Sequence, residues 1–189
     1  MSDIQPRYIE MRSEVTGSTL TGYASVYGTY ADLGSYVETF APGSFDAALG
    51  GDADVRSFWN HDSGMLLGRQ STGTLKVWTD TTGLGFEVSL PNTSAGNDVR
   101  ELAERGDIGG VSIGFRPGEE DHTGRVGNRA LRTHTSVARL IEISPCSIPA
   151  YSSTSVHLRS LEHITQPAID GRTQLFLARH AAHYRKVSN

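Results

Sequence analysis

Ser112 lies two positions from Gly110 and two positions from Gly114, in a segment where bulky apolar residues occupy the alternate places. Successive side chains of a strand point to opposite faces, so the alternation predicts a strand with Ser112 and both glycines on one face. The glycines leave bare backbone beside the hydroxyl, which gives a substrate chain room to approach it. Ser112 is therefore a candidate nucleophile; the alternative is a strand serine at a bulge or a close packing contact.

The same segment matches G-x-S-x-G, the nucleophile elbow of α/β-hydrolases. That motif requires a strand, a sharp turn at the serine and then a helix. Here the apolar alternation continues through the serine to Phe115, and Arg116-Pro117-Gly118 follows without a helical pattern. We therefore reject the elbow interpretation.

A serine hydroxyl becomes a good nucleophile when a base, commonly histidine, takes its proton and a third group orients that base. His61 ends the apolar run 55–60, so we expect it at the rim of a sheet, where a solvated histidine is the alternative. Glu142 lies between two isoleucines, where a carboxylate either faces water as an ordinary surface glutamate or has a partner. Asp62 is a weaker orienting group, because neighbours on a strand point to opposite faces.

Several of these side chains are also of metal-binding types, as are those of His122 and His134. No pair shows a recognised ligand spacing such as H-E-x-x-H or C-x-x-C. We therefore expect neither a metal nor another cofactor, and a metal site remains a minor alternative.

The composition limits the class of protein. A length of 189 residues suits one domain with a short appendage, and a net charge of -4 without a basic block argues against a nucleic-acid partner. Cys146 is the only cysteine, which rules out an internal disulfide and fits a reducing compartment. No apolar run approaches membrane-spanning length, and the N-terminus lacks the apolar core of a signal peptide. We expect a soluble intracellular protein without a membrane partner.

Short apolar runs separated by many of the 21 glycines predict a fold rich in short strands. The patterns predict two helices, over 44–49 and from 97 or 98 to 105, and a polar, mobile loop over 117–128 that would gate a substrate. Strands are expected over 7–12, 20–27, 36–40, 55–60, 74–79, 84–90, 109–115 and 130–143.

A set of short motifs between about residues 22 and 156 resembles the prohead, or capsid-maturation, proteases of tailed bacteriophages. Each motif is weak alone, but their order and spacing together are specific. The motifs are Gly22-Tyr23-Ala24-Ser25-Val26-Tyr27, Glu38-Thr39-Phe40-Ala41-Pro42-Gly43-Ser44-Phe45, Asn60-His61-Asp62 with Leu67-Gly68, Thr82-Gly83-Leu84, Gly110-Val111-Ser112-Ile113-Gly114-Phe115, Ile141-Glu142-Ile143-Ser144 and Ile148-Pro149-Ala150. The chain beyond Leu158 lies outside the resemblance.

That family is similar to the herpesvirus assemblin proteases, so the resemblance implies a mainly β fold with flanking helices. The expected form is a closed antiparallel β-barrel of the assemblin type over residues 1–158, with 159–189 as a linker and C-terminal helix that is self-cleaved or docks on the shell. By resemblance, His61 is the general base, Ser112 the nucleophile and Glu142 the acidic third member, all on the outer surface of the barrel. The assemblin relatives use a second histidine in the third role.

The function that the resemblance implies is a serine endopeptidase of capsid maturation. Its substrates would be the scaffold protein or the scaffolding segment of the major capsid protein, and itself, inside the procapsid in the host cytoplasm. A homodimer or a shell-associated multimer is expected, because assemblin-like relatives dimerise. The alternative is a non-catalytic capsid- or scaffold-binding module on the same fold, and a metal hydrolase is a more distant one.

Overall fold

A computed structural model describes residues 5–10, 14–50, 52–108 and 110–147 of the protein. This part of the chain is mainly β with a few short helices, as the sequence predicts. The expected linker and C-terminal helix over 159–189 lie outside the described residues, as does the motif at 148–150.

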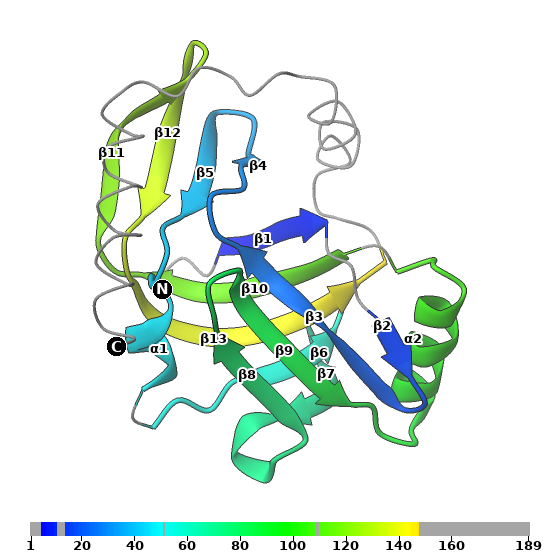
Figure 1. Ribbon diagram of the computed structural model, residues 1–189. Coiled ribbons are helices and arrows are strands. Elements are labelled where there is room, and N and C mark those ends of the chain that lie inside the picture. The colour runs from blue at the N-terminus through cyan, green and yellow to red at the C-terminus, as the bar shows by residue number, and fades with distance from the viewer. Residues whose placement is uncertain (1–4, 11–13, 51, 109, 148–189) are drawn as a thin grey trace.

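The strand that carries Ser112 lies inside a five-stranded sheet (Figure 1). All neighbours in this sheet are antiparallel except β13 and β6, which run parallel. The register places Ser112 opposite Tyr8 on one side and opposite Ser144 on the other. In spatial order the strands are β1 (Gln5–Glu10), β10 (Gly110–Pro117), β13 (Val137–Cys146), β6 (Arg56–Trp59) and β7 (Asp62–Arg69).

A second, antiparallel sheet contains the hairpin that the sequence predicts most clearly. Asp80 Oδ1 accepts hydrogen bonds from the backbone N–H groups of Thr82 and Gly83, and this fixes the turn of the hairpin. In spatial order the strands are β2 (Glu14–Thr16), β3 (Thr19–Val26), β9 (Gly83–Ser89) and β8 (Leu75–Thr79).

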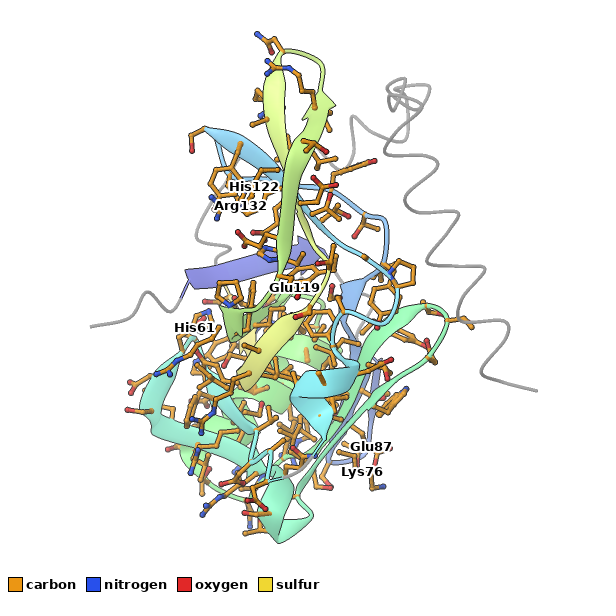
Figure 2. The ribbon with its side chains drawn as sticks, turned by 90° about the vertical axis from the view of Figure 1, so that its left-hand side faces the viewer. His61, Lys76, Glu87, Glu119, His122 and Arg132 are labelled. Carbon is orange, nitrogen blue, oxygen red and sulfur yellow. The ribbon has the colours of Figure 1, made fainter. Side chains whose placement is uncertain are left out.

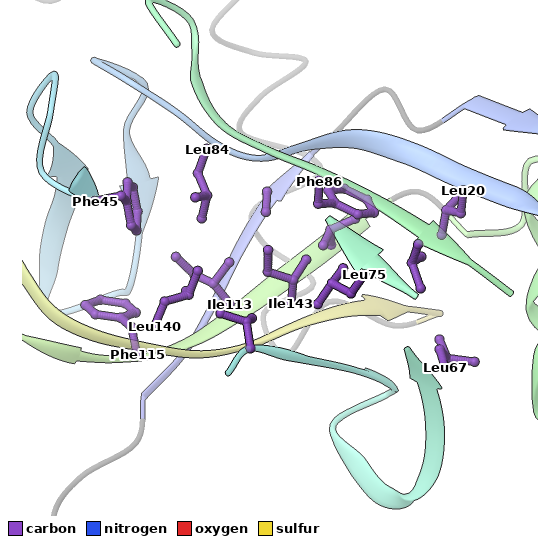
Figure 3. Packing of buried hydrophobic residues seen from close by; sticks show 14 of the residues in the cluster. Leu20, Phe45, Leu67, Leu75, Leu84, Phe86, Ile113, Phe115, Leu140 and Ile143 are labelled. Carbon is purple, nitrogen blue, oxygen red and sulfur yellow. The ribbon is translucent and has the colours of Figure 1, made fainter. Parts of the chain in front are cut away.

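The hydrophobic core lies between these two sheets (Figure 3). Leu20 and Phe86 of the second sheet face Ile113, Phe115 and Ile143 of the first, and all five are almost completely buried. Burying one such side chain contributes about 1.5–3 kcal/mol to folding. The apolar face of β10 therefore packs in the core, and Ser112 lies on the opposite face.

A third sheet extends beyond one end of the other two (Figure 1). It consists of β11 (Glu120–Val126), β12 (Arg129–His134), β5 (Tyr36–Phe40) and β4 (Ala31–Asp32), with β12 parallel to β5. The prediction of a loop over 117–128 is wrong, because most of this segment is β11. Its polar side chains are mostly exposed on an outer strand, so it shows no apolar alternation, but its backbone is paired with β12.

Two further strand predictions need correction. The single strand expected over 130–143 is two strands in different sheets, and the turn between them is made by Thr135 and Ser136, whose N–H groups both bond to the Glu119 carbonyl. No glycine or proline marks this break in the sequence. Strand β7 is also absent from the predictions, because its first five residues are all exposed.

The helical segments cover little of the chain. They are α1 (Asp46–Leu49), the 3₁₀ turn η1 (Gln70–Thr72) and α2 (Ser94–Glu104). Helix α2 begins earlier than expected because the Thr93 hydroxyl accepts the Gly96 N–H and caps it. Within the described residues, none of the helices has the length and apolar character needed to span a bilayer.

The expectation of a mainly β protein with flanking helices is thus confirmed at the level of fold class. Backbone hydrogen bonds join the described strands into three sheets of five, four and four strands rather than one continuous closed barrel.

The third sheet is held to the core by a buried histidine. His134 Nε2 lies 2.8 Å from Glu38 Oε2, and its Nδ1 lies 2.9 Å from Glu120 Oε1. The imidazole also stacks on Phe40 and meets the edge of Phe115, a residue of the first sheet. One side chain therefore links β5, β11 and the main core.

We expect His134→Phe to lower the free energy of unfolding by about 3 kcal/mol, because Glu38 loses its imidazole partner inside the protein. The double variant His134→Phe, Glu38→Leu should regain much of this loss, since it removes the buried carboxylate as well. Chemical denaturation of both variants provides the measurement. Equal stability of the single and double variants would show that the contact with Glu38 is energetically unimportant.

Candidate active site

His61 lies in the two-residue turn that connects β6 and β7. Trp59 and Asp62 pair across the turn, and the two residues between them, Asn60 and His61, have φ angles of 51° and 63°. Two positive φ angles characterise a type I′ turn, in which the second place is normally glycine. A histidine in this left-handed conformation costs about 1 kcal/mol, and strain of this kind concentrates at functional sites.

The turn brings His61 directly to Glu142. His61 Nδ1 lies 2.8 Å from Glu142 Oε1, with 23% of the imidazole and 11% of the carboxylate side chain exposed. Two contacts place the turn there: β6 runs beside β13 with Arg56 in register with Glu142, and the Asn60 N–H bonds to the Pro145 carbonyl. The two residues were predicted as partners from separate parts of the sequence, and the fold brings them together.

Glu142 is held on its other side as well. Ser144 Oγ donates a 2.8 Å hydrogen bond to Glu142 Oε2, so each carboxylate oxygen has a partner. The Glu142 side chain lies over Gly114, where an added Cβ would come within 2.6 Å of Glu142 Cγ. The space above Gly114, which the sequence suggested for an approaching substrate, is therefore taken by Glu142.

Ser112 lies on the same face of the sheet as these groups. It is the register partner of Ser144, so Glu142 is its diagonal neighbour on β13, with the two Cα atoms about 7–8 Å apart. Its neighbours Val111 and Ile113 point into the core, as predicted. Ser112 is completely buried rather than open at an outer surface.

The alternatives considered for the other two residues are wrong. Glu142 is not a surface glutamate, since it is buried and bound to His61 and Ser144. His61 is not a solvated terminal histidine, since its ring is bound to Glu142.

The site favours a charged pair of His61 and Glu142. Contacts with Cys146 first and with Glu142 second raise the pKa of His61 to about 10, although burial lowers it. Burial raises the pKa of Glu142, but the hydrogen bonds from His61 and Ser144 outweigh this effect and hold it below its ordinary value. Both pKa shifts therefore favour the charged forms of the pair, the imidazolium and the carboxylate.

Sequence reasoning missed two members of this cluster, Ser144 and Cys146. Both follow Glu142 at steps of two along β13, which puts them on its face; the strand period already predicts this face for Ser144, but not its bond to Glu142. Cys146 lies beyond the strand expected over 130–143 and is the last residue of β13. In the structure its thiol is buried and donates to the Ser144 carbonyl.

The remaining candidates lie elsewhere. Asp62 Oδ1 accepts the Gly64 N–H, whereas His61 is bound by Glu142. His122 and His134 belong to the third sheet, and Figure 2 shows His122 apart from His61. Across residues 5–10, 14–50, 52–108 and 110–147, no three His, Cys, Asp or Glu side chains are grouped so that they could hold a metal ion.

The positive φ of His61 implies that this residue does not stabilise the turn. We expect His61→Gly to be more stable than His61→Ala by about 1 kcal/mol, because glycine adopts the left-handed conformation without steric cost. Both variants lose the contact with Glu142, so their difference isolates the backbone strain. Thermal or chemical denaturation measures it, and equal stabilities would contradict the turn conformation.

The charged pair predicts a pH-dependent stability. The raised pKa of His61 stabilises the fold fully below about pH 6.5, and this contribution declines as the pH rises towards about 10. The lowered pKa of Glu142 stabilises the fold above about pH 4.5. The loss of unfolding free energy in Glu142→Gln should therefore be larger near pH 6 than near pH 10. A loss independent of pH would exclude the charged pair.

The family of the chain follows from comparisons with known proteins. No solved structure matches the chain significantly. The prohead protease of Enterobacteria phage HK97 is 28% identical over 138 residues, which are 71% of this chain and 57% of that protein, so the match spans less than two thirds of the relative. The model of the caudovirus prohead serine protease family matches residues 7–167. The resemblance in the motifs is thereby confirmed, and the chain belongs to the caudovirus prohead serine protease family.

Proposed function

We propose that this protein is a serine endopeptidase of phage capsid maturation. In this proposal Ser112 is the nucleophile, His61 the general base and Glu142 the acidic third member. Membership of the family and the prohead protease of phage HK97 as a relative support a protease.

The observation that carries the proposal is the 2.8 Å contact between His61 Nδ1 and Glu142 Oε1, on the sheet face that also bears Ser112. An acid that binds one nitrogen of a histidine leaves the other nitrogen to take a proton from a nucleophile. The strained backbone of His61 supports the same role, because a glycine would make the turn at lower cost.

The reaction follows from these positions. The Glu142 carboxylate holds the proton on His61 Nδ1, so the neutral ring accepts the Ser112 proton at Nε2. Ser112 Oγ then attacks the carbonyl carbon of the scissile bond, and the leaving amine takes the proton back from His61. Water hydrolyses the resulting acyl-enzyme by the same route in reverse, with His61 again as the base.

In this proposal, two features of the site must change before a peptide is cut. Ser112 is completely buried, so the site must open to admit a substrate. The pKa of His61 is about 10, so the imidazolium must lose its proton before it acts as a base. The described arrangement therefore corresponds to a resting form in the proposed cycle.

The finer parts of the proposal rest on the family. The substrates would be the scaffold protein or the scaffolding segment of the major capsid protein, inside the procapsid of an infected cell, and the protease would form a homodimer or a shell-associated multimer. Residues 159–189 would be a tail that is removed by self-cleavage or docks on the shell, a part of the proposal that rests on the change in composition after Leu158 and not on the family. The closed assemblin-type barrel also stays a prediction, since the described strands form three sheets.

One observation favours a second candidate, a non-catalytic module that binds capsid or scaffold protein. A module of this kind has no need of an accessible serine, and Ser112 is completely buried. The protease and the non-catalytic module predict different results when the Ser112 hydroxyl is removed.

We expect Ser112→Ala to abolish processing of the co-expressed scaffold and capsid proteins of the same phage. Glu142→Gln should slow processing by up to about 10⁴-fold, the loss that follows when the third member of a Ser-His-Asp triad no longer sets the histidine tautomer. Gel analysis of the substrates over time provides the measurement.

Ser25→Ala is a matched control, because Ser25 is an equally buried serine in the second sheet. The Ser25→Ala variant should process the scaffold and capsid proteins at the wild-type rate. Unchanged processing by Ser112→Ala would leave the non-catalytic module as the function.

A further inference from the structure

We propose that Ser144 is a positioning residue that fixes the Glu142 carboxylate in the orientation that His61 requires. The inference rests on the proposed function, in which Glu142 orients the base. No role for Ser144 follows from the family match itself.

Ser144 contacts the Glu142 carboxylate directly. Ser144 Oγ donates to Glu142 Oε2 over 2.8 Å, while Glu142 Oε1 lies 2.8 Å from His61 Nδ1. One carboxylate oxygen therefore serves the histidine and the other serves the serine. Two bonds at opposite ends of a planar group fix both its position and its rotation.

On β10, the residue opposite Glu142 provides no side chain that could hold its carboxylate. The Glu142 side chain lies over Gly114, and a glycine offers no side chain to hold it in place. Ser144 shares the face of β13 with Glu142, because the two residues are two positions apart on the strand. The hydroxyl thus supplies, from the same strand, a fixed point that the opposite strand does not.

Ser144 also affects the charge of Glu142. The hydrogen bond from Ser144 is one of the contacts that lower the pKa of Glu142, against the effect of burial. A hydroxyl that donates to a carboxylate stabilises its ionised form. Ser144 therefore favours both the orientation and the charge that Glu142 needs to hold the proton on His61 Nδ1.

Ser144→Ala, Ser144→Thr and Ser57→Ala in the full chain test this role. Threonine keeps a hydroxyl at position 144. Ser57→Ala is the matched control, since Ser57 is equally buried, lies in the same sheet, and has no hydrogen-bond partner for its hydroxyl within the described residues.

The first measurement is an NMR titration of the His61 imidazole, which needs no enzymatic activity. Its shift at acidic pH reports the protonation of Glu142. We expect the acidic midpoint to move to higher pH in Ser144→Ala, to return towards the wild-type value in Ser144→Thr, and to stay unchanged in Ser57→Ala. A wild-type titration in Ser144→Ala would overturn the inference.

The second measurement is phosphonylation of Ser112 by a fluorophosphonate, in which the serine oxygen bonds to phosphorus and fluoride leaves, followed by mass spectrometry. In Ser144→Ala the maximal labelling rate should fall about tenfold, the size of one hydrogen bond to a charged group, with the half-saturating concentration unchanged. Ser144→Thr should restore the maximal labelling rate towards that of the wild type. An unchanged rate, or a loss that appears only in the half-saturating concentration, contradicts a positioning role.

The two measurements separate this inference from the function on which it rests. If the wild-type protein is not labelled at Ser112 under any condition, the proposed function fails. The titration then decides by itself whether Ser144 orients Glu142.

Discussion

The contact between His61 and Glu142 is the constraint on which the rest of the site depends. It joins a hairpin turn at the edge of the first sheet to the middle of β13, and so requires β6 and β13 to lie side by side. The parallel pairing of these strands meets this requirement, and the Asn60 N–H bond to Pro145 reinforces it. Because β13 also pairs with β10, the same arrangement brings the pair next to the strand of Ser112.

Two local rules are broken to make this contact. A histidine occupies the glycine place of a type I′ turn, and a carboxylate is buried over the bare backbone of Gly114. The charges of the pair compensate, since each stabilises the ionised form of the other. The same compensation opposes catalysis, because an imidazolium is not a base. In the proposed cycle, a substrate that opens the site would also have to favour loss of this proton.

The buried His134 shows that a histidine, a residue type common in active sites, can also stabilise the fold. It contacts two carboxylates, as a catalytic histidine would contact one, but it lies between Phe40 and Phe115 and joins the third sheet to the core. In the sequence, His61 and His134 are both single histidines without a recognised ligand spacing. Their difference arises from the neighbours that the fold supplies: the sheet face of Ser112 for one and a closed aromatic contact for the other.

The sequence by itself determined the mainly β class, the β8–β9 hairpin and the two faces of β10, because these depend on alternation along one strand. Tertiary structure decided everything that depends on pairing between distant segments. It split 130–143 into strands of two sheets, made β11 from a polar segment, buried Ser112 and gave the space above Gly114 to Glu142. A period along one strand tells which side chains share a face, whereas the register between strands decides which of them meet.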